Sequence, residues 1–358
     1  MRDGMTAMPT AETAKIAIFG AGAMGTVLGA FLTKGGLKNV ELIARNVAHV
    51  NALKEKGATV HCRADNMKFT QSVTAIFPDE MQGKYDVLFL MTKQRNNKEI
   101  LTHLLPFLHE NSIVCTTQNG LPELSVAEVV GTERAYGAAT SFGANFLGDG
   151  GVELTSKQSA MQMQIGGYQN DGKGLMLLSE ILSYAGNAIG KADFVTVTEN
   201  LSGARWSKLC INAAFSSLSA LTGLTFGQIA RRRKTRKLAL AILREGISAA
   251  KSGGVELAKM QGHDMEKMLG GKTPLKRFIA YLVLPFAMRK HKKLHSGMLK
   301  DIQNGKRCEI DFVLGAVCRE SQKTGVETPV CDQVLQMIHG IENGLYETDY
   351  KNVDFFDI

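Results

Sequence analysis

Three closely spaced glycines near the start of the chain constrain its fold more than any other feature. In the stretch IAIFGAGAMG, Gly20, Gly22 and Gly25 follow an apolar run and open a helical pattern. In such a strand–turn–helix, the first glycine permits the tight turn, the second lets the backbone approach a pyrophosphate, and the third lets the helix pack on the strand. We therefore predict a dinucleotide site that also includes Ala23 and Met24. The alternative is an ordinary strand–helix turn.

The segments around this turn alternate between strand and helix patterns. KIAIFG, NVELIAR, YDVLFLMTK and SIVCTTQNG are apolar and typical of buried strands, whereas MGTVLGAFLTKGG, NVAHVNALKEKG and EILTHLLPFLHEN repeat their apolar residues at helical spacing. Beyond about Thr198, long amphipathic helical patterns replace the strands. We predict an α/β protein with a Rossmann-type dinucleotide-binding domain over 14–197, built on a parallel sheet, and a mostly α-helical C-terminal domain over 198–358.

The end of the second predicted strand indicates which dinucleotide binds. NAD-binding domains usually have an acidic residue there for the ribose hydroxyls, but this chain has LIARN, with Ala44 and Arg45 at that place. An arginine suits the 2′-phosphate of NADP. We therefore predict NADPH as the cofactor, with an ordinary surface arginine as the alternative.

One helical segment carries a candidate catalytic lysine. In RWSKLCINAAFSSLS, Lys208, Asn212 and Ser216 recur at i, i+4 and i+8, so a cation, an amide and a hydroxyl share one helix face. A lysine in a desolvated cleft has a lowered pKa and can protonate a carbonyl oxygen. The alternative is that Lys208 has no catalytic role: its aliphatic stem is buried and its ammonium group reaches water, which the same spacing also allows.

Five blocks in order make the chain resemble the 2-dehydropantoate 2-reductase (ketopantoate reductase) family over nearly its whole length: IAIFGAGAMG, MTK, QNG, RWSKLCINAAFSSLSALTG and SGMLKDIQNGKRCEIDFVLG. The resemblance implies NADPH-dependent reduction of a 2-keto acid. It implies Lys208 as proton donor and Glu309 as its carboxylate partner. It also implies Lys93 and Asn119 near the nicotinamide ribose and substrate, and Asn212 as a substrate ligand.

The chain departs from the family at three substrate-side positions. An asparagine–proline pair usually continues the catalytic helix, where this chain has Ser216 and Ser217. A serine usually precedes the MLQD block, but here Gly297 does so and Ser296 stands one position earlier. Leu314 occupies the place of a family asparagine. We expect Ser216 and Ser296 to contact the substrate.

The positive charge is local. The formal net charge of +8 comes from the runs 231–237 and 289–293, which hold ten Lys and Arg residues, and the rest of the chain has a net charge of −2. Such runs are usually solvated helix faces, and neither contains the aromatic residues that stack on nucleic-acid bases, so we expect no nucleic-acid partner. The insertion 268–295 would cap the site or form a subunit contact in a homodimer. His291 and His295 lack an acidic third ligand nearby, so we expect no metal.

Other features bound the cellular setting. The six cysteines show no paired or metal-ligand spacing, which favours free thiols, and no apolar segment of a secretory signal precedes the first strand. The apolar run 278–288 is too short to cross a bilayer and contains Pro285. We expect a cytoplasmic protein with a small-molecule substrate and no membrane partner.

Two other functional classes remain open from the sequence. A related hydroxy-acid or opine-type dehydrogenase would also place polar groups on a helix beyond a Rossmann-type domain. A non-catalytic NADP-binding sensor, or a scaffold that binds phosphates through the basic runs, would keep the fold without the reaction. The joint presence of Lys208, Asn212 and Glu309 favours an enzyme.

Overall fold

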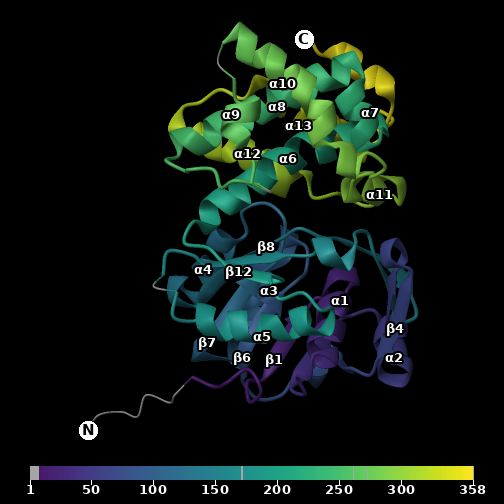
Figure 1. Cartoon of the computed structure of the whole chain (residues 1–358), viewed down its shortest axis with the longest axis vertical. Helices are drawn as coiled ribbons and strands as arrows, with labels where there is room; N and C mark the ends of the chain where they lie inside the picture. The colour runs from purple at the N-terminus through teal and green to yellow at the C-terminus, as the bar shows by residue number, and fades with distance from the viewer. Residues whose placement is uncertain (1–7, 171, 261, 272, 358) are drawn as a thin grey trace. The chain divides into compact units, whose positions relative to one another are not determined.

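The computed structural model describes residues 8–170, 172–260, 262–271 and 273–357. The chain divides into two compact units (Figure 1). The first takes the residues up to Gln118 together with Pro122–Leu201, and the second takes Asn119–Leu121 together with the residues from Ser202 onward. The short segment Asn119–Leu121 thus leaves the first unit and groups by its contacts with the second.

The first unit is built on an eight-stranded sheet with the order β12-β11-β8-β7-β6-β1-β2-β5. Its neighbouring strands run parallel, except that β11 is antiparallel to β8. The predicted parallel sheet is confirmed for β1, β2, β6 and β7, the strands on which the prediction rested, and the antiparallel pairing of β11 with β8 is a feature that the sequence patterns do not reveal. The strands are β1 (Ile16–Phe19), β2 (Val40–Ile43), β5 (Thr74–Ile76), β6 (Tyr85–Leu90), β7 (Leu108–Thr116), β8 (Ala135–Thr140), β11 (Met163–Gly167) and β12 (Val195–Val197).

Helices cover both faces of this sheet, because its central strand is apolar on both sides. Ile16 and Ile18 of β1 pack in one core cluster, whereas Ala17 and Phe19 pack in another. The first cluster includes residues of α1 and α5, and the second includes residues of α3 and α4. The helices of this unit are α1 (Ala23–Lys34), α2 (Val47–Lys56), α3 (Asn97–Leu104), α4 (Glu123–Val130) and α5 (Leu175–Ala188).

The structure contains a second sheet that the sequence patterns do not predict, and one helix is shorter than predicted. A second, four-stranded sheet has the order β4-β3-β10-β9 and consists of β3 (Ala58–Cys62), β4 (Met67–Gln71), β9 (Ala144–Gly148) and β10 (Gly151–Leu154). The helix predicted for EILTHLLPFLHEN ends at Leu104, and Pro106 lies in a short 3-10 turn. Proline blocks helix continuation, so β7 begins at once, at Leu108.

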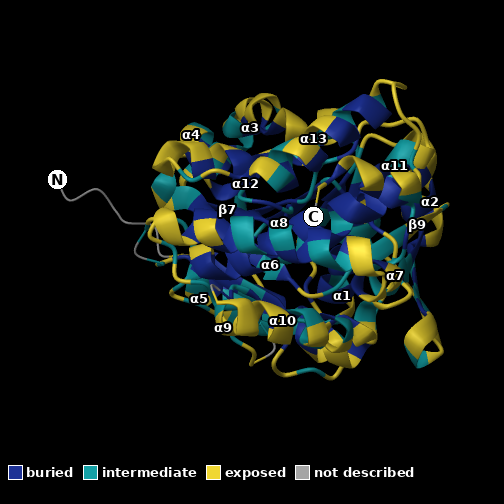
Figure 2. Cartoon of the chain, turned by 90° about the horizontal axis from the view of Figure 1, so that it is seen from above, coloured by how far each residue is buried: buried dark blue, intermediate teal, exposed yellow. Residues whose placement is uncertain are grey.

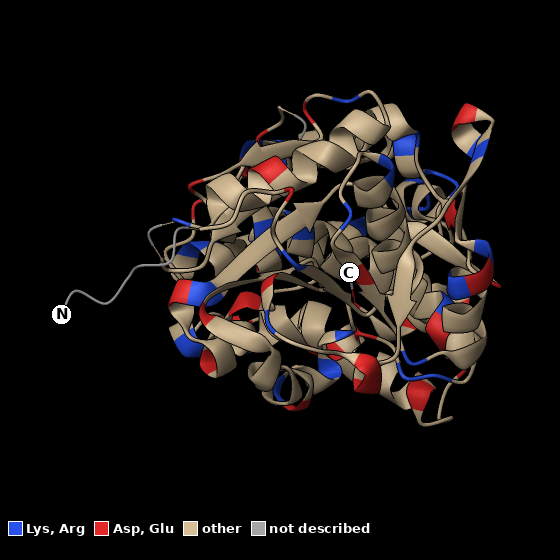
Figure 3. Cartoon of the chain, turned by 90° about the horizontal axis from the view of Figure 1, so that it is seen from below, with Lys and Arg blue, Asp and Glu red and all other residues tan. Residues whose placement is uncertain are grey.

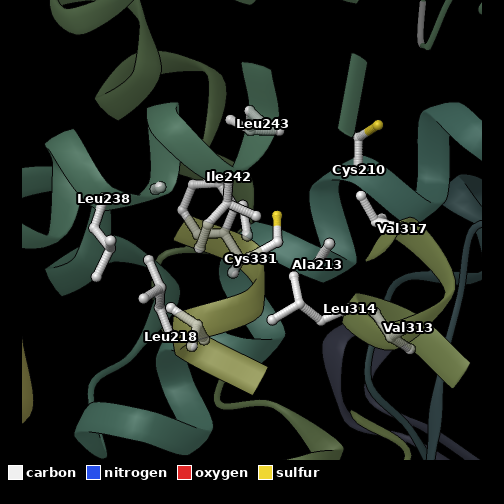
Figure 4. Close-up of a cluster of buried hydrophobic side chains, with 14 of the residues drawn as sticks. Cys210, Ala213, Leu218, Leu238, Ile242, Leu243, Val313, Leu314, Val317 and Cys331 are labelled. Carbon is white, nitrogen blue, oxygen red and sulfur yellow. The ribbon is translucent and has the colours of Figure 1, made fainter. Parts of the chain in front are cut away.

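The second unit is helical, as predicted. Its core brings together residues from α6, α8, α12 and α13, including Cys210, Leu243, Leu314 and Cys331 (Figure 4). Figure 2 shows buried residues concentrated along these helices. The helices are α6 (Leu201–Thr222), α7 (Phe226–Arg231), α8 (Arg233–Ser252), α9 (Met265–Leu269), α10 (Pro274–Ala287), α11 (Gly297–Gln303), α12 (Ile310–Thr324) and α13 (Pro329–Glu342).

Local sequence explains several helix ends in this unit. α7 begins with a capping box, in which Thr225 accepts a hydrogen bond from the backbone N–H of Gln228. α12 ends at Thr324 and is followed by Gly325, whose φ of +72° suits glycine. Within the described part of the chain, no helix is long and apolar enough to span a membrane.

Candidate active site

The glycine turn joins β1 to α1, as its sequence predicts. Gly20 has a φ of +97°, and a Cβ there would lie 2.6 Å from the backbone nitrogen of Thr92. A Cβ on Gly25 would lie 2.7 Å from the carbonyl oxygen of Gly20. The fold itself therefore requires glycine at both positions.

Gly22 differs because no described atom fills the space beside it. A Cβ built there meets nothing within 4 Å, and its φ is −78°. The first hydrogen bond within α1 runs from Thr26 N to Gly22 O at 2.9 Å, and the N-cap Gly22 has no side chain to accept from the N–H groups before it. Ala23, Met24 and Gly25 thus bring helix N-terminal N–H groups to an open space. The pyrophosphate of a dinucleotide fits this arrangement.

The turn lies where the strand order reverses. β1 pairs with β2 on one side and with β6 on the other, and the chain returns from the edge strand β5 to β6. The backbone N–H of Met91 donates to Phe19 O at 2.8 Å, so the loop after β6 runs beside the glycine turn. Open α/β sheets bind ligands at such a reversal. Lys93 follows in this loop and is exposed.

Buried amides tie the loop after β6 to the loop after β7. Nδ2 of Asn97 donates to Oε1 of Gln118 at 2.9 Å, and Nε2 of Gln118 donates back to Oδ1 of Asn97 at 2.7 Å. Nε2 of Gln118 also donates to Oγ1 of Thr92 at 3.3 Å. The network positions the backbone next to Lys93 and the segment that leads into the half-buried Asn119. Sequence reasoning missed Asn97 and Gln118, because isolated amides form no motif.

Arg45 lies in the short connection between β2 and α2 and is exposed. It forms no hydrogen bond or ion pair with any other described residue. The next residue, Asn46, caps α2 by accepting from His49 N at 3.0 Å, and no acidic residue stands in the first turn of that helix. Glu41, on β2, accepts from the hydroxyl of Tyr85 at 2.5 Å. The guanidinium and the helix N-terminus thus form a positive region without a carboxylate in the connection.

In the second unit, α6 presents the predicted polar stripe. Lys208, Asn212 and Ser216 are all half-buried, whereas Leu209 and Ala213 beside them are buried. The stripe is therefore the accessible face of a helix that is otherwise packed into the core. The residues next to the stripe along α6 are mostly small or apolar.

The surroundings of Lys208 lower its affinity for a proton. The pKa of the Lys208 ammonium is lowered to about 7, chiefly by burial and then by the positive charge of Arg205, while the carboxylate of Glu309 opposes both effects. Arg205 is only 2% exposed and precedes Lys208 by less than one helical turn. Glu309 is half-buried at the N-cap position of α12. A group with this pKa can donate a proton at neutral pH.

The burial of Arg205 is not predicted from the sequence, because arginine is usually found at the surface. Its position three residues before Lys208 places both side chains on the same side of the helix, and this spacing could have indicated that Arg205 influences the lysine. Its burial depends on how α6 packs in the helical unit.

Ser296 serves first as a helix cap. It is 2% exposed, and its hydroxyl accepts from Leu299 N at 3.0 Å at the start of α11. Its own backbone N–H donates to Oγ of Ser219 on α6 at 3.2 Å. The hydroxyl keeps its proton for a further acceptor. Gly297 is exposed, and a Cβ there would meet nothing within 4 Å.

The other positions that depart from the family have different surroundings. Leu314 is fully buried and packs in the core of the helical unit beside Ala213 and Val317 (Figure 4). The hydroxyl of Ser217 is buried and has no hydrogen-bond partner among the described residues. Leu314 thus contributes to packing in the core. Of Ser216, Ser217 and Leu314, Ser216 is the one that lies on the half-buried stripe of α6.

The basic run 231–237 is partly tied to the protein itself. Cζ of Arg232 lies 4.6 Å from the ring centroid of Tyr350, and Lys234 forms an ion pair with Asp354. The run is therefore more than a solvated helix face. On the view in Figure 3, basic and acidic residues are interspersed.

The cysteines and histidines show no metal cluster in the described ranges. No group of three His, Cys, Asp or Glu side chains there could hold a metal ion. All six cysteines are buried free thiols, as predicted. His291 lies in a short 3-10 turn, Arg289–His291, so the helix that we expected around it is wrong.

Comparisons with known proteins identify the same family in both halves of the chain. A model described as "Ketopantoate reductase PanE/ApbA" matches residues 16–168, and one described as "Ketopantoate reductase PanE/ApbA C terminal" matches residues 200–342. A 2-dehydropantoate 2-reductase of Lactococcus lactis subsp. lactis is 27% identical over 332 residues, which covers 92% of this chain and 98% of the relative.

Solved structures share the fold at lower identity. The ternary structure of a D-mandelate dehydrogenase with NADH and anilino(oxo)acetate has a TM-score of 0.76 and 23% identity, and covers 92% of this chain and 99% of its own. A dimeric ketopantoate reductase from Staphylococcus aureus has a TM-score of 0.69 and 17% identity, with coverages of 92% and 99%.

The two family models match the sheet unit and the helical unit separately and in order. Together they match most of the chain, and the curated relative covers nearly the same residues. The chain therefore belongs to the ketopantoate reductase PanE/ApbA family and is an oxidoreductase that acts on a CH–OH group.

Proposed function

We propose that this protein reduces the carbonyl group of a 2-keto acid with NADPH, and that Lys208 is the general acid. The observation that carries the proposal is a lysine whose pKa is about 7 on the accessible stripe of α6, under the influence of Glu309. The substrate class follows from the relative named 2-dehydropantoate 2-reductase. The substrate is 2-dehydropantoate, which would give pantoate, or a related 2-keto acid.

The cofactor would be held mainly by the first domain, for which we keep the boundaries 14–197. The open space at Gly22 and the N–H groups of Ala23, Met24 and Gly25 suit its pyrophosphate. Arg45 would bind the 2′-phosphate. The bound nicotinamide supplies the hydride. A nicotinamide cofactor is supported by the NADH in the D-mandelate dehydrogenase structure.

The remaining cofactor-side residues lie in the two loops that the buried amides connect. Lys93 is exposed after β6, and Asn119 is half-buried after β7. We assign both to the nicotinamide ribose and the adjoining substrate. Gly20 completes the cofactor set by allowing the turn itself.

The second domain, for which we keep the boundaries 198–358, would carry the proton chemistry. Lys208 donates its proton to the carbonyl oxygen as negative charge develops there, which avoids a free alkoxide. Glu309 orients the ammonium group and keeps its pKa from falling further. Asn212, Ser216 and Ser296 supply hydrogen bonds to polar groups of the substrate.

Oxidation of NADPH with a panel of 2-keto acids tests this function. The panel contains 2-dehydropantoate, phenylglyoxylate, pyruvate and branched-chain 2-keto acids, each with NADPH and with NADH. We expect turnover of at least one member and a preference for NADPH. Cofactor binding without turnover of any member would instead favour the non-catalytic sensor, and turnover only with an added amino acid would favour an opine-type dehydrogenase.

We also propose that the protein is a cytoplasmic homodimer. The dimeric ketopantoate reductase with the same fold supports the dimer, and the buried free cysteines fit a reducing compartment. Light scattering on the purified full chain measures the mass directly. A single species at 38.8 kDa would contradict the dimer.

A further inference from the structure

A cavity in the helical unit lies apart from the polar stripe of α6. It has a volume of about 380 Å³, at the lower end of the range for small-molecule sites. Two helices, α8 and α10, supply all the described residues that line it, which are Arg233, Lys237, Leu240, Arg244, Arg277, Phe278 and Tyr281. Four of them are cations, and none carries a carboxylate.

The helix spacing explains how the cations come together. Arg233, Lys237, Leu240 and Arg244 follow one another at intervals of four, three and four residues, so they share one face of α8. Leu240 is buried at the base of this face. α10 completes the cavity and contains no acidic residue.

Arg236 of the basic run holds the two helices in place. Its Cζ lies 4.3 Å from the ring centroid of Tyr281, and its Nε donates to Ala230 O at 2.6 Å. Its side chain also donates to the carbonyl oxygen of Arg231 at 2.6 Å. The position of Tyr281 in the cavity wall is therefore set by an interaction across the helices.

Two guanidinium groups of the cavity repel each other. Burial lowers the pKa of Arg244, and the positive charge of Arg277 lowers it further. Glu245 opposes this effect, but its two carboxylate oxygens accept from Val330 N at 3.0 Å and Cys331 N at 2.8 Å at the start of α13. The carboxylate of Glu245 is thus engaged by the N-terminus of α13. A bound anion would reduce the repulsion between Arg244 and Arg277.

An apolar surface adjoins the cavity. Phe278 lines the cavity and is 59% exposed, and Leu275, Leu282 and Phe286 are exposed on the same helix. A ligand whose anionic group enters the cavity could place an apolar portion here. This surface fits either the organic part of a soluble metabolite or the acyl region below a lipid headgroup.

We propose that this cavity binds a phosphate group, which the guanidinium groups of Arg244 and Arg277 clamp while Arg233 and Lys237 add positive charge. Guanidinium groups match the geometry of phosphate oxygens and form charge-assisted hydrogen bonds with them. The phosphate belongs to a soluble small molecule or to a lipid headgroup. The site is separate from the residues that we assign to the reduction.

Calorimetric titration of the full chain with inorganic pyrophosphate tests the soluble source, in the presence of saturating NADP⁺ so that the glycine turn is occupied. Co-sedimentation with phosphatidylcholine vesicles, with and without phosphatidylinositol phosphate, tests the lipid source. The test variant is Arg244→Gln/Arg277→Gln. The matched control, Arg231→Gln/Lys290→Gln, removes the same charge from exposed residues that do not line the cavity.

We expect the test variant to weaken binding of one probe at least tenfold and the control to change it less than twofold. Binding of pyrophosphate in this pattern identifies a soluble ligand, and binding of the phosphoinositide vesicles alone identifies a lipid. Binding of neither probe, or equal weakening in the control, overturns the proposal. If the double variant does not fold, Arg277→Gln alone serves, because Arg277 is exposed on α10.

Discussion

The pH dependence of the reduction tests how the helical unit sets the acidity of Lys208. With a pKa of about 7, the ammonium form falls from about 90% at pH 6 to about 1% at pH 9. If this form donates the proton, kcat/KM falls by nearly two orders of magnitude over this range, about tenfold for each pH unit above the pKa. An ordinary lysine, with a pKa of about 10.4, would give a flat profile.

Two substitutions move this profile in opposite directions. Arg205→Gln removes a positive neighbour, so the pKa of Lys208 rises and the fall in kcat/KM begins at higher pH. Glu309→Gln removes the opposing carboxylate, so the fall begins at lower pH. Arg205→Lys retains the charge and is the control for the first change, and the thermal midpoint reports whether the buried site tolerates either variant.

The assay is kcat/KM for NADPH oxidation with the best 2-keto acid, measured from pH 5.5 to 9.5 at constant ionic strength. A flat profile in the wild type would refute the lowered pKa of Lys208 as the controlling acidity. An unchanged limb in folded Arg205→Gln would refute the role of Arg205.

Three other outcomes follow from the site. Arg45→Ala should remove a preference of at least tenfold for NADPH over NADH, or about 1.4 kcal/mol, measured as the ratio of the two dissociation constants; an unchanged ratio would contradict the 2′-phosphate contact. Gly22→Ala should retain the thermal midpoint but weaken NADPH binding at least tenfold, because its Cβ meets no protein atom and would enter the space for the cofactor. Gly25→Ala should lower the thermal midpoint, because its Cβ meets protein atoms. Loss of folding in Gly22→Ala would show that the open space has another use. The kcat/KM for 2-dehydropantoate should lie below that of the best panel member, because unpaired polar substrate atoms cost roughly 1–3 kcal/mol each; a value well above every other 2-keto acid would show compensating contacts.

The parts of the fold that are local in sequence could be predicted. Gly25 is required by its contact with Gly20 within one strand–turn–helix, and Gly20 has a φ of +97° in the same turn, so the glycine pattern can be recognised in one short stretch. The contact of Gly20 with Thr92 is added by the loop after β6. The long helices of the second unit follow from apolar periodicity. The direction of β11 could not be predicted, because an apolar run does not specify whether its neighbour is parallel.

The surroundings of the site depend on residues that are distant in sequence. The burial of Arg205 requires the packing of α6 in the helical unit. The bond between Asn97 and Gln118 requires two loops to meet at the end of the sheet. Leu314 shows the reverse: sequence comparison suggests a change at the substrate side, whereas the structure places its side chain in the core.

Single-turnover hydride transfer by Lys208→Ala tests the central claim most directly, together with NADPH affinity and the thermal midpoint. Loss of the proton donor should slow transfer by ~10²–10⁴, or about 2.7–5.4 kcal/mol. Folding should tolerate the change, because burial disfavours the charged lysine at neutral pH and below. NADPH affinity should change by less than about twofold. Transfer within about threefold of wild type, in a folded variant that binds NADPH normally, would contradict Lys208 as the general acid.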